Sequence, residues 1–137
     1  MSSRLPVYSL PIRVYFQDTD AGGVVYHASY LNFLERARTE WMRERYGYSN
    51  AGFMQEFGMV FVVRSLKLDY LRPALLDDML AVSAEIRAIG RSRVTLAQRV
   101  LRGDEAMVEA EVNLVCVTVD GFKPVAVPEA LREKWKD

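Results

Sequence analysis

The sequence predicts a domain of the α+β class, in which an antiparallel sheet of about five strands wraps around one long helix. Two patterns support this class: one long stretch of helical periodicity in the first half, and repeated alternation with a period of two in the second. The 137 residues fit a single domain, 1–137, because no linker, repeat or low-complexity run interrupts them. With 50% of its residues hydrophobic, the chain can bury one packed core.

The first element is a short strand that leads into a glycine-containing loop. Residues 12–16 have the mixed polarity of a strand, and turn-forming residues follow it. Two adjacent glycines, Gly22 and Gly23, permit backbone angles that are closed to other residues. We therefore expect a sharp loop before the next element.

The second element is an amphipathic helix from Ser29 to about Tyr46. Its apolar residues recur at helical spacing and most of its charged residues lie on the other side, so one face is expected to be buried. Ser29 is expected to cap the start of this helix, and Gly47 is expected to end it. A short helical turn is expected at 51–57.

Four long strands make up most of the second half. Breaks between them are expected at Arg72-Pro73, Asp77-Asp78, Gly90 and Gly103-Asp104. Each strand alternates apolar with polar residues, which is typical of a strand with one face on a core. Short connections favour antiparallel neighbours. A short terminal helix is expected from Pro128 to Trp135.

The segment Met59–Val63 is apolar at every position, which predicts burial on both of its faces. The long helix can cover only one face of the sheet. A second copy of the chain is the expected cover for the other, so we expect at least a dimer.

Charge, cysteine content and the N-terminal residues limit the classes of function. The chain carries 18 Lys and Arg against 18 Asp and Glu, so it lacks the basic excess typical of nucleic-acid binders. Its single cysteine cannot form an internal disulfide, and nothing indicates an oxidising compartment. Residues 1–10 have neither the apolar run of a membrane anchor nor the cleavage site of a signal peptide. We expect a cytoplasmic protein without a transmembrane segment.

The loop from Asp18 to His27 is the densest polar constellation in the chain, and it directly precedes the long helix. Free N–H groups and the macrodipole at a helix N-terminus can stabilise an oxyanion. A carboxylate nearby can attack a carbonyl carbon or activate a water. These groups together suffice for acyl transfer. The alternative is that the aspartates only cap and shape the turn, which is the commoner role of such loops.

Other polar residues have weaker claims to a chemical role. His27, the only histidine, is either a base or hydrogen-bond donor, or a half-buried packing residue. Glu35 is expected to form a surface ion pair with Arg38. Cys116 falls on the apolar face of a strand and is expected to be buried and inert. No metal-ligand spacing accompanies the loop, and neither GxSxG nor GxGxxG occurs.

A basic turn is expected between two strands at Gly90-Arg91-Ser92-Arg93. Two arginines and a hydroxyl group suit a phosphate-bearing ligand. A solvated turn is the more common role of such a segment, so a phosphate site here needs support from other residues.

Several segments match the pattern of one known family. The most specific is Asp-Thr-Asp-Ala-Gly-Gly-Val-Val-Tyr-His at 18–27. The others are Arg13–Tyr30 around it, Leu34–Arg38, Phe61–Arg64, Pro73–Ala74, Leu76–Asp78, Gln98–Arg99, Glu109–Val112 and Val115–Val117. Over nearly the whole chain, these segments resemble the Tol-Pal-associated acyl-CoA thioesterases, within the group similar to 4-hydroxybenzoyl-CoA thioesterase.

The resemblance implies a hotdog fold, an antiparallel sheet around one long helix, paired into dimers and often tetramers. It implies an active site at a subunit interface, with Asp20, the second aspartate of the Asp-x-Asp pair, as the catalytic carboxylate. Tyr26 and His27 are implied to lie at the catalytic centre. Backbone N–H groups at the helix start would hold the thioester carbonyl, with Gly23 and Val24 in contact with the substrate.

The resemblance also suggests roles further from the reaction. The phosphates of CoA tend to meet basic residues at the turn that matches Arg91, Ser92 and Arg93. Asp18 is expected to shape the loop through backbone hydrogen bonds, and Glu35 to support the site. In the hydroxybenzoyl branch a tyrosine replaces the histidine at the position of residue 27, which argues against a hydroxybenzoyl substrate.

These residues lead to the hypothesis that the chain hydrolyses a short- to medium-chain acyl-CoA thioester to a free acid and CoA, without cofactor or metal. Asp20 would act as the nucleophile or as the general base for water. One alternative is an enoyl-CoA hydratase or dehydratase that pairs His27 with Glu35. Another is a recruitment protein, because the family is associated with the Tol-Pal system, acyl carrier protein and phospholipid-synthesis enzymes. Such partners would hold it at the inner membrane. A homodimer that assembles to a homotetramer is expected, and nucleic acid is not an expected partner.

Overall fold

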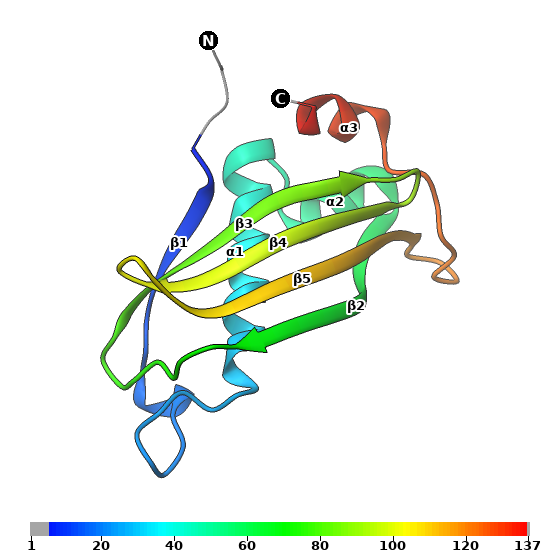
Figure 1. Cartoon of the computed structure of the whole chain (residues 1–137). Helices are drawn as coiled ribbons and strands as arrows, with labels where there is room; N and C mark the ends of the chain where they lie inside the picture. Colours follow the sequence, from blue (N-terminus) through cyan, green and yellow to red (C-terminus); the bar gives the residue numbers. More distant parts are fainter. Residues whose placement is uncertain (1–5, 137) are drawn as a thin grey trace.

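Five strands form one antiparallel sheet in the computed structural model, which describes residues 6–136 (Figure 1). The strands are β1 (Tyr8–Arg13), β2 (Met59–Tyr70), β3 (Met79–Ile89), β4 (Arg93–Arg102) and β5 (Glu105–Thr118). The helices are the 3₁₀ turn η1 (Phe16–Asp18), α1 (Ser29–Tyr46), α2 (Asn50–Phe57) and α3 (Glu129–Trp135). The strand order is β1-β3-β4-β5-β2, and all neighbours are antiparallel. The predicted α+β class, with one sheet around one long helix, is confirmed.

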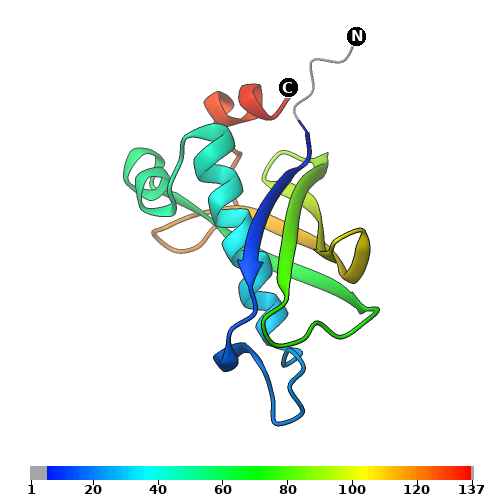
Figure 2. The ribbon, with the colours of Figure 1, turned by 90° about the vertical axis from the view of Figure 1, so that its left-hand side faces the viewer.

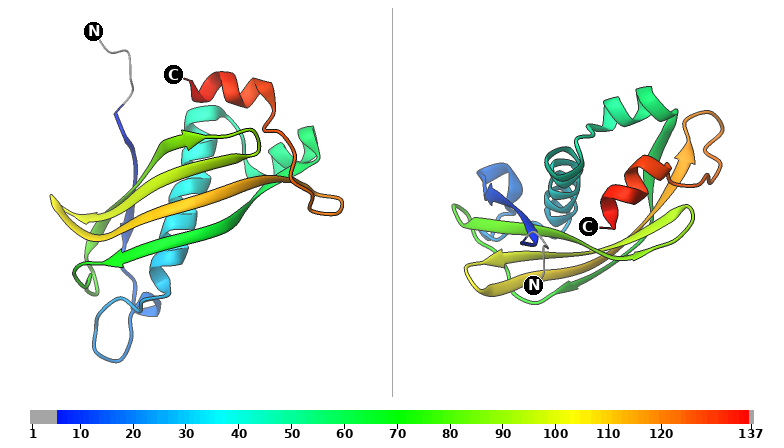
Figure 3. Two further views of the ribbon diagram at one scale, coloured as in Figure 1. Left: turned by 45° about the vertical axis from the view of Figure 1, so that its right-hand side comes forward. Right: turned by 90° about the horizontal axis from the view of Figure 1, so that it is seen from above.

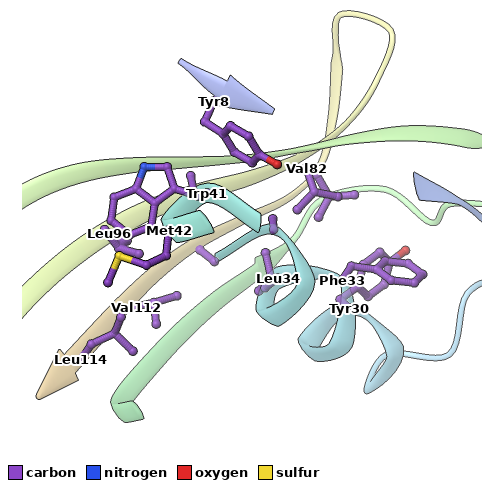
Figure 4. Packing of buried hydrophobic residues seen from close by; sticks show 14 of the residues in the cluster. Tyr8, Tyr30, Phe33, Leu34, Trp41, Met42, Val82, Leu96, Val112 and Leu114 are labelled. Atoms are coloured by element: carbon purple, nitrogen blue, oxygen red, sulfur yellow. The ribbon is translucent and has the colours of Figure 1, made fainter. Parts of the chain in front are cut away.

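Helix α1 lies in the hollow of the curved sheet, as the turned views in Figures 2 and 3 show. Its buried face includes Phe33, Leu34 and Ala37, which are fully shielded from solvent. Full burial of a Leu or Phe side chain contributes about 1.5–3 kcal/mol, so this face holds the helix on the sheet. Figure 4 shows Phe33 and Leu34 of the helix in one core with sheet residues Val82, Leu96 and Val112.

A buried glutamine adds a polar anchor between the sheet and the helix. Gln98 of β4 is fully buried, and its Nε2 donates to the carbonyls of Leu34 in α1 and Ser83 in β3, both at 3.1 Å. Its Oε1 accepts a bond of 3.1 Å from Nη1 of Arg38. A fully satisfied buried network of this kind specifies one arrangement of the packed elements. Gln98 therefore fixes the position of α1 on the sheet, including the position of its first residues.

The first strand differs from its expected position. It covers Tyr8–Arg13 and not 12–16, because its ladder with β3 begins at Tyr8. Pro11 is tolerated within it because β1 is an edge strand, where one row of N–H groups needs no partner. Phe16 belongs to the turn η1 and is 83% exposed.

The helix ends agree with the prediction at one end only. Ser29 is the first residue of α1 and not its cap, because the preceding residue is Ala28, which has no side-chain acceptor. At the other end Gly47 adopts φ 81° and its N–H donates to the carbonyl of Arg43 at 3.0 Å, as expected of a terminating glycine. Nζ of Lys134 in α3 donates to the carbonyl of Tyr46 at 3.0 Å. The short helices near residues 51–57 and at the C-terminus are confirmed.

Strand β2 forms one edge of the sheet, although β3 follows it in the sequence. It pairs with β5 from Met59↔Thr118 to Tyr70↔Val108, and its other edge has no partner within the described chain. Val62 and Val63 are 37% and 47% exposed, so burial of both faces is not reached within one chain. The dimer that this apolar strand predicts stays a prediction.

The limits of the described part of the chain bear on two expectations. Among residues 6–136, no helix has both the length and the apolar character needed to cross a membrane. Residues 1–5, which begin the segment expected to lack a signal peptide, lie outside the described part, as does residue 137.

Candidate active site

The loop from Asp18 to His27 folds back on itself between η1 and α1. Its two arms meet through the bridge Thr19↔Val25 and through the N–H of Tyr26, which donates to the carbonyl of Asp18 at 2.8 Å. The loop hangs below the start of α1 in Figure 1, with its tip turned away from the helix. Asp20, Gly23, Val24, Tyr26 and His27 are thus brought to one end of the helix, as expected.

The connection between β2 and β3 forms a platform for this loop. The N–H of Val25 donates to the carbonyl of Ala74 at 2.8 Å, and the N–H of Leu76 donates to the carbonyl of Gly23 at 3.2 Å. These two hydrogen bonds form the bridge between Val24 and Leu75. They fix the glycine-containing arm of the loop to this one segment.

An ion pair stiffens the platform itself. Oδ2 of Asp78 accepts a bond of 2.8 Å from the N–H of Leu75 and a bond of 2.9 Å from Nη1 of Arg102. Asp77 has φ 72°, and its carbonyl accepts a bond of 2.8 Å from Nη1 of Arg13. From the sequence, Asp77-Asp78 is expected only as a break between strands. The arginine partners of both residues come from distant strands, so no local pattern predicts these contacts.

Asp18 is turned into the protein. Its side chain is 8% exposed, and its Oδ2 accepts a bond of 2.8 Å from the backbone N–H of Tyr15. This agrees with the expected role of Asp18, which shapes the loop through backbone hydrogen bonds. A carboxylate held inward in this way cannot also reach a substrate at the surface.

Asp20 is turned outward, in a tight turn. Its Oδ1 accepts a bond of 2.8 Å from the N–H of Gly22, and its carbonyl accepts a bond of 3.1 Å from the N–H of Gly23. Gly23 has φ 81°, which favours glycine. Within residues 6–136 the second carboxylate oxygen of Asp20 has no protein donor, so it is available to a ligand.

The start of α1 is an uncapped helix N-terminus. No side chain caps it, and its first turn has no acidic residue. The N–H of Ser29 turns back to the carbonyl of Tyr26 at 2.8 Å. Within the described chain, the N–H groups of His27 and Ala28 donate to no protein acceptor. Free N–H groups and the positive end of the macrodipole favour a developing negative charge.

Aromatic rings surround this helix start. The rings of Tyr26 and His27 lie 4.4 Å apart, centroid to centroid, and both side chains are exposed. The hydroxyl of Tyr70, the last residue of β2, donates to the carbonyl of His27 at 3.2 Å. The buried hydroxyl of Tyr30 accepts a bond of 3.0 Å from the N–H of Ala74, and burial raises the pKa of Tyr30 above its ordinary value. Sequence reasoning missed Tyr30 and Tyr70, which join the loop to the sheet.

The basic turn 91–93 lies far from Asp20 within one chain. The loop and this turn occupy opposite ends of the sheet (Figure 1). Strand β4 spans the separation, and its ten residues extend about 30 Å at ~3.3 Å per residue. Arg91 and Arg93 have exposed side chains, and the carbonyl of Ser92 accepts a bond of 2.7 Å from the N–H of Cys116. One chain therefore does not combine the expected phosphate site with the loop from Asp18 to His27.

Glu35 also stands apart from the loop. It lies six residues beyond Ser29, or about 9 Å along the axis of α1 at ~1.5 Å per residue. The expected surface ion pair with Arg38 is wrong, because the guanidinium of Arg38 turns inward to Gln98. Burial lowers the pKa of Arg38, and the charge of Glu35 partly offsets that effect. His27 and Glu35 do not form a pair within one chain.

Two further side-chain expectations concern reactive groups. Cys116 is fully buried, and burial raises the pKa of its thiol to about 11, so the thiol is neutral at pH 7. The expectation that it is buried and inert agrees with this environment. The part of the chain that the structure describes contains no group of three or more His, Cys, Asp or Glu placed to hold a metal.

Comparisons with known proteins place this geometry in a family. The family model described as thioesterase-like superfamily matches residues 14–135. The acyl-CoA thioesterase YbgC of Haemophilus influenzae is 42% identical over 125 residues, 91% of this chain and 91% of its own. The acyl-CoA thioester hydrolase YbgC of Escherichia coli is 43% identical over 131 residues, 95% of this chain and 96% of its own.

A solved structure agrees with the fold. The crystal structure of a probable thioesterase from Bartonella henselae superimposes with a TM-score of 0.85 at 33% identity, covering 90% of this chain and 100% of that one. Together with the family match over most of the chain, this likeness identifies the sheet and helix as the hotdog arrangement. The chain belongs to the thioesterase-like superfamily.

Proposed function

We propose that this member of the thioesterase-like superfamily hydrolyses acyl-CoA thioesters with Asp20 as its catalytic carboxylate. The activity class rests on the two YbgC relatives, which are 42% and 43% identical over most of both chains. By that identity the chain is an acyl-CoA thioester hydrolase. The products are a free acid and CoA.

One observation carries the assignment of Asp20: its exposed carboxylate lies in the loop that leads directly into an uncapped helix N-terminus. The two features supply the two needs of acyl transfer. Free N–H groups at His27 and Ala28 can hold the carbonyl oxygen of the thioester and stabilise the negative charge that forms on it. The free carboxylate oxygen of Asp20 can then act at the carbonyl carbon.

Two routes use these same groups. In the first, Asp20 attacks the carbonyl carbon, the C–S bond breaks, CoA leaves as a thiolate, and water hydrolyses the resulting anhydride. In the second, Asp20 accepts a proton from a water as that water attacks the carbonyl carbon; the C–S bond then breaks, and CoA leaves as a thiolate that takes up a proton. The exposed rings of Tyr26 and His27 line the approach, where His27 orients the substrate or the water. Gly23 and Val24 contact the substrate through their backbone. Asp18 and Glu35 support the site from outside the reaction.

A second copy of the chain is part of this proposal. The exposed apolar edge of β2 supports a homodimer, and pairs of dimers then form a homotetramer. Arg91, Ser92 and Arg93 of one copy would meet the phosphates of a CoA molecule bound at the loop of the other. The proposed substrates are acyl groups of short to medium length, and the proposed location is the cytoplasm.

Recruitment of partners is the second candidate function. Acyl carrier protein, phospholipid-synthesis enzymes or Tol-Pal components would be the partners, at the inner membrane. A pull-down that survives Asp20→Asn would favour this function beside hydrolysis. The hydratase alternative is disfavoured by the distance along α1 between His27 and Glu35.

The test is a thiol-release assay across acyl-CoA chain lengths, with Asp20→Asn and Asp18→Asn as a matched pair. We expect Asp20→Asn to lower turnover by about 10²-fold or more, in the range of lost acid–base or covalent catalysis. We expect Asp18→Asn, which retains an acceptor for the N–H of Tyr15, to remain active. Unchanged turnover in Asp20→Asn would remove its assignment. Loss of absorbance from an enoyl-CoA would revive the hydratase.

A further inference from the structure

The loop between β5 and α3 presents an aromatic side chain in an unfavourable backbone conformation. Phe122 has φ 51°, directly after Gly121 with φ 84°, and its side chain is 66% exposed. A positive φ is rare for a bulky residue. Within residues 6–136, Phe122 belongs neither to the hydrophobic core nor to the residues packed against it, so burial does not compensate for this conformation.

Hydrogen bonds hold this conformation in place. The N–H of Thr118 donates to the carbonyl of Lys123 at 2.9 Å, and the N–H of Lys123 donates to Oγ1 of Thr118 at 3.2 Å. The same hydroxyl donates to the carbonyl of Asp120 at 2.6 Å. A strained residue that its surroundings fix in this way is characteristic of functional positions. The loop is built to present the ring of Phe122.

The position of the loop indicates what the ring meets. The loop projects beyond the end of the sheet opposite to Asp20 (Figures 1 and 3). The N–H of Val119 donates to the carbonyl of Gly58 at 2.9 Å, which fastens the loop to the start of β2. The end of β2 is fastened to the active-site loop, because Tyr70 bonds the carbonyl of His27. Strand β2 thus connects the aromatic loop at one end with the active site at the other.

Pairing of two copies along the free edge of β2 would bring these two ends together. It is twelve residues long and contains no proline, and Val62, Val63 and Leu66 on it are exposed. Two copies that pair along this edge about a two-fold axis run antiparallel. The start of β2 in one copy then lies beside the end of β2 in the other. In that pairing, the loop of Phe122 in one copy lies at the same end as the His27 and Tyr70 of its partner.

We propose that Phe122 of one copy closes the Asp20 site of a second copy, as a substrate-contacting residue that acts across the dimer. Its ring packs on the apolar part of the bound thioester, beside the exposed ring of Tyr26. This inference rests on the proposed function, and it adds a specificity residue that Asp20 and the helix start do not provide. The Asp20 site of an isolated chain then lacks the Phe122 ring of a second copy.

The variant Phe122→Gly separates this role from a purely structural one. Glycine adopts a positive φ without strain, so the variant is expected to unfold at the same temperature as the wild type or a higher one. The loss of the ring is expected to lower kcat/KM for acyl-CoA by about tenfold or more, mainly through KM. Phe122→Leu, which keeps an apolar side chain, is expected to retain most of the wild-type kcat/KM. Wild-type kinetics in Phe122→Gly would overturn the proposal.

Mixed dimers test whether the residue acts across the interface. One copy carries Asp20→Asn and the other carries Phe122→Gly, coexpressed and purified through two different tags. Only an interface arrangement leaves one site with both wild-type residues, so activity should rise well above the sum of the two homodimers. No recovery, or a monomer by light scattering, would overturn the proposal. Full activity in the Asp20→Asn homodimer would instead refute the proposed function, so the two failures are distinguishable.

Discussion

The two ends of helix α1 are built in opposite ways. At the C-terminal end, the N–H of Gly47 and the ammonium of Lys134 satisfy backbone carbonyls, and Arg43 and Arg45 place positive charge in the last turn. At the N-terminal end no side chain caps the helix and no acidic residue lies in the first turn. The difference shows that the capped C-terminal end stabilises the helix, whereas the uncapped N-terminal end is available to a ligand.

The largest stability effect is expected just outside the open end, at Asp18. Replacing Asp18 by Ala removes the acceptor for the N–H of Tyr15 at a buried site, which costs about 1–3 kcal/mol of unfolding free energy. Urea unfolding of Asp18→Ala and Asp18→Asn measures this cost, because Asn keeps an acceptor. Equal stability of Asp18→Ala and wild type would contradict the structural role of this carboxylate.

At the closed end, Gly47→Ala forces a Cβ into a left-handed conformation with φ 81°. The expected loss is about 1–2 kcal/mol of unfolding free energy. Turnover per folded molecule should not change, since the substitution lies at the end of α1 far from Asp20. Thermal unfolding and thiol release on the same preparation check both parts. A large fall in turnover would break the division of roles between the two ends.

The smallest expected effect is that of Asn32→Asp at the open end of α1. This substitution is expected to raise stability and to lower turnover, so it separates the two roles of the helix start. Asn32 is exposed in the first turn of α1, and Asn32→Asp adds a negative charge there without changing the shape of the side chain. The interaction of that charge with the helix dipole should stabilise the fold by about 0.3–1 kcal/mol. The same charge opposes a developing oxyanion, so turnover should fall. Added salt should reduce both effects, and faster turnover in Asn32→Asp would count against an oxyanion site at this end.

The sequence predicted the helix better than it predicted the sheet. The 3.6-residue period and Gly47 give the bounds of α1 directly, because both are local features. The pairing of β2 with β5 joins residues far apart in the chain, and alternation along a strand carries no information about its partner. For the same reason the placement of β2 at the edge had to come from the structure.

The candidate site shows the same limit. Asp20 and the loop around it are contiguous in sequence, so their chemistry could be proposed from the residues and from the family resemblance. The platform of Asp78 and Arg102, and the contact of Tyr70 with His27, combine segments from different strands. The positive φ of Phe122 could not be predicted from the sequence, because a positive φ is ordinarily expected at glycine and not at a bulky residue.

In the proposed mechanism, Asp20 performs chemistry, and other residues provide the stability of the fold. The most direct measurement compares turnover and unfolding free energy of Asp20→Asn with the wild type on the same preparations. The amide oxygen of Asn can still accept the bond from the N–H of Gly22, so the unfolding free energy should stay within about 0.5 kcal/mol, as for an exposed substitution. Turnover should fall by about 10²-fold or more. Retained turnover, or a loss of turnover matched by a loss of folding, would contradict this catalytic role of Asp20.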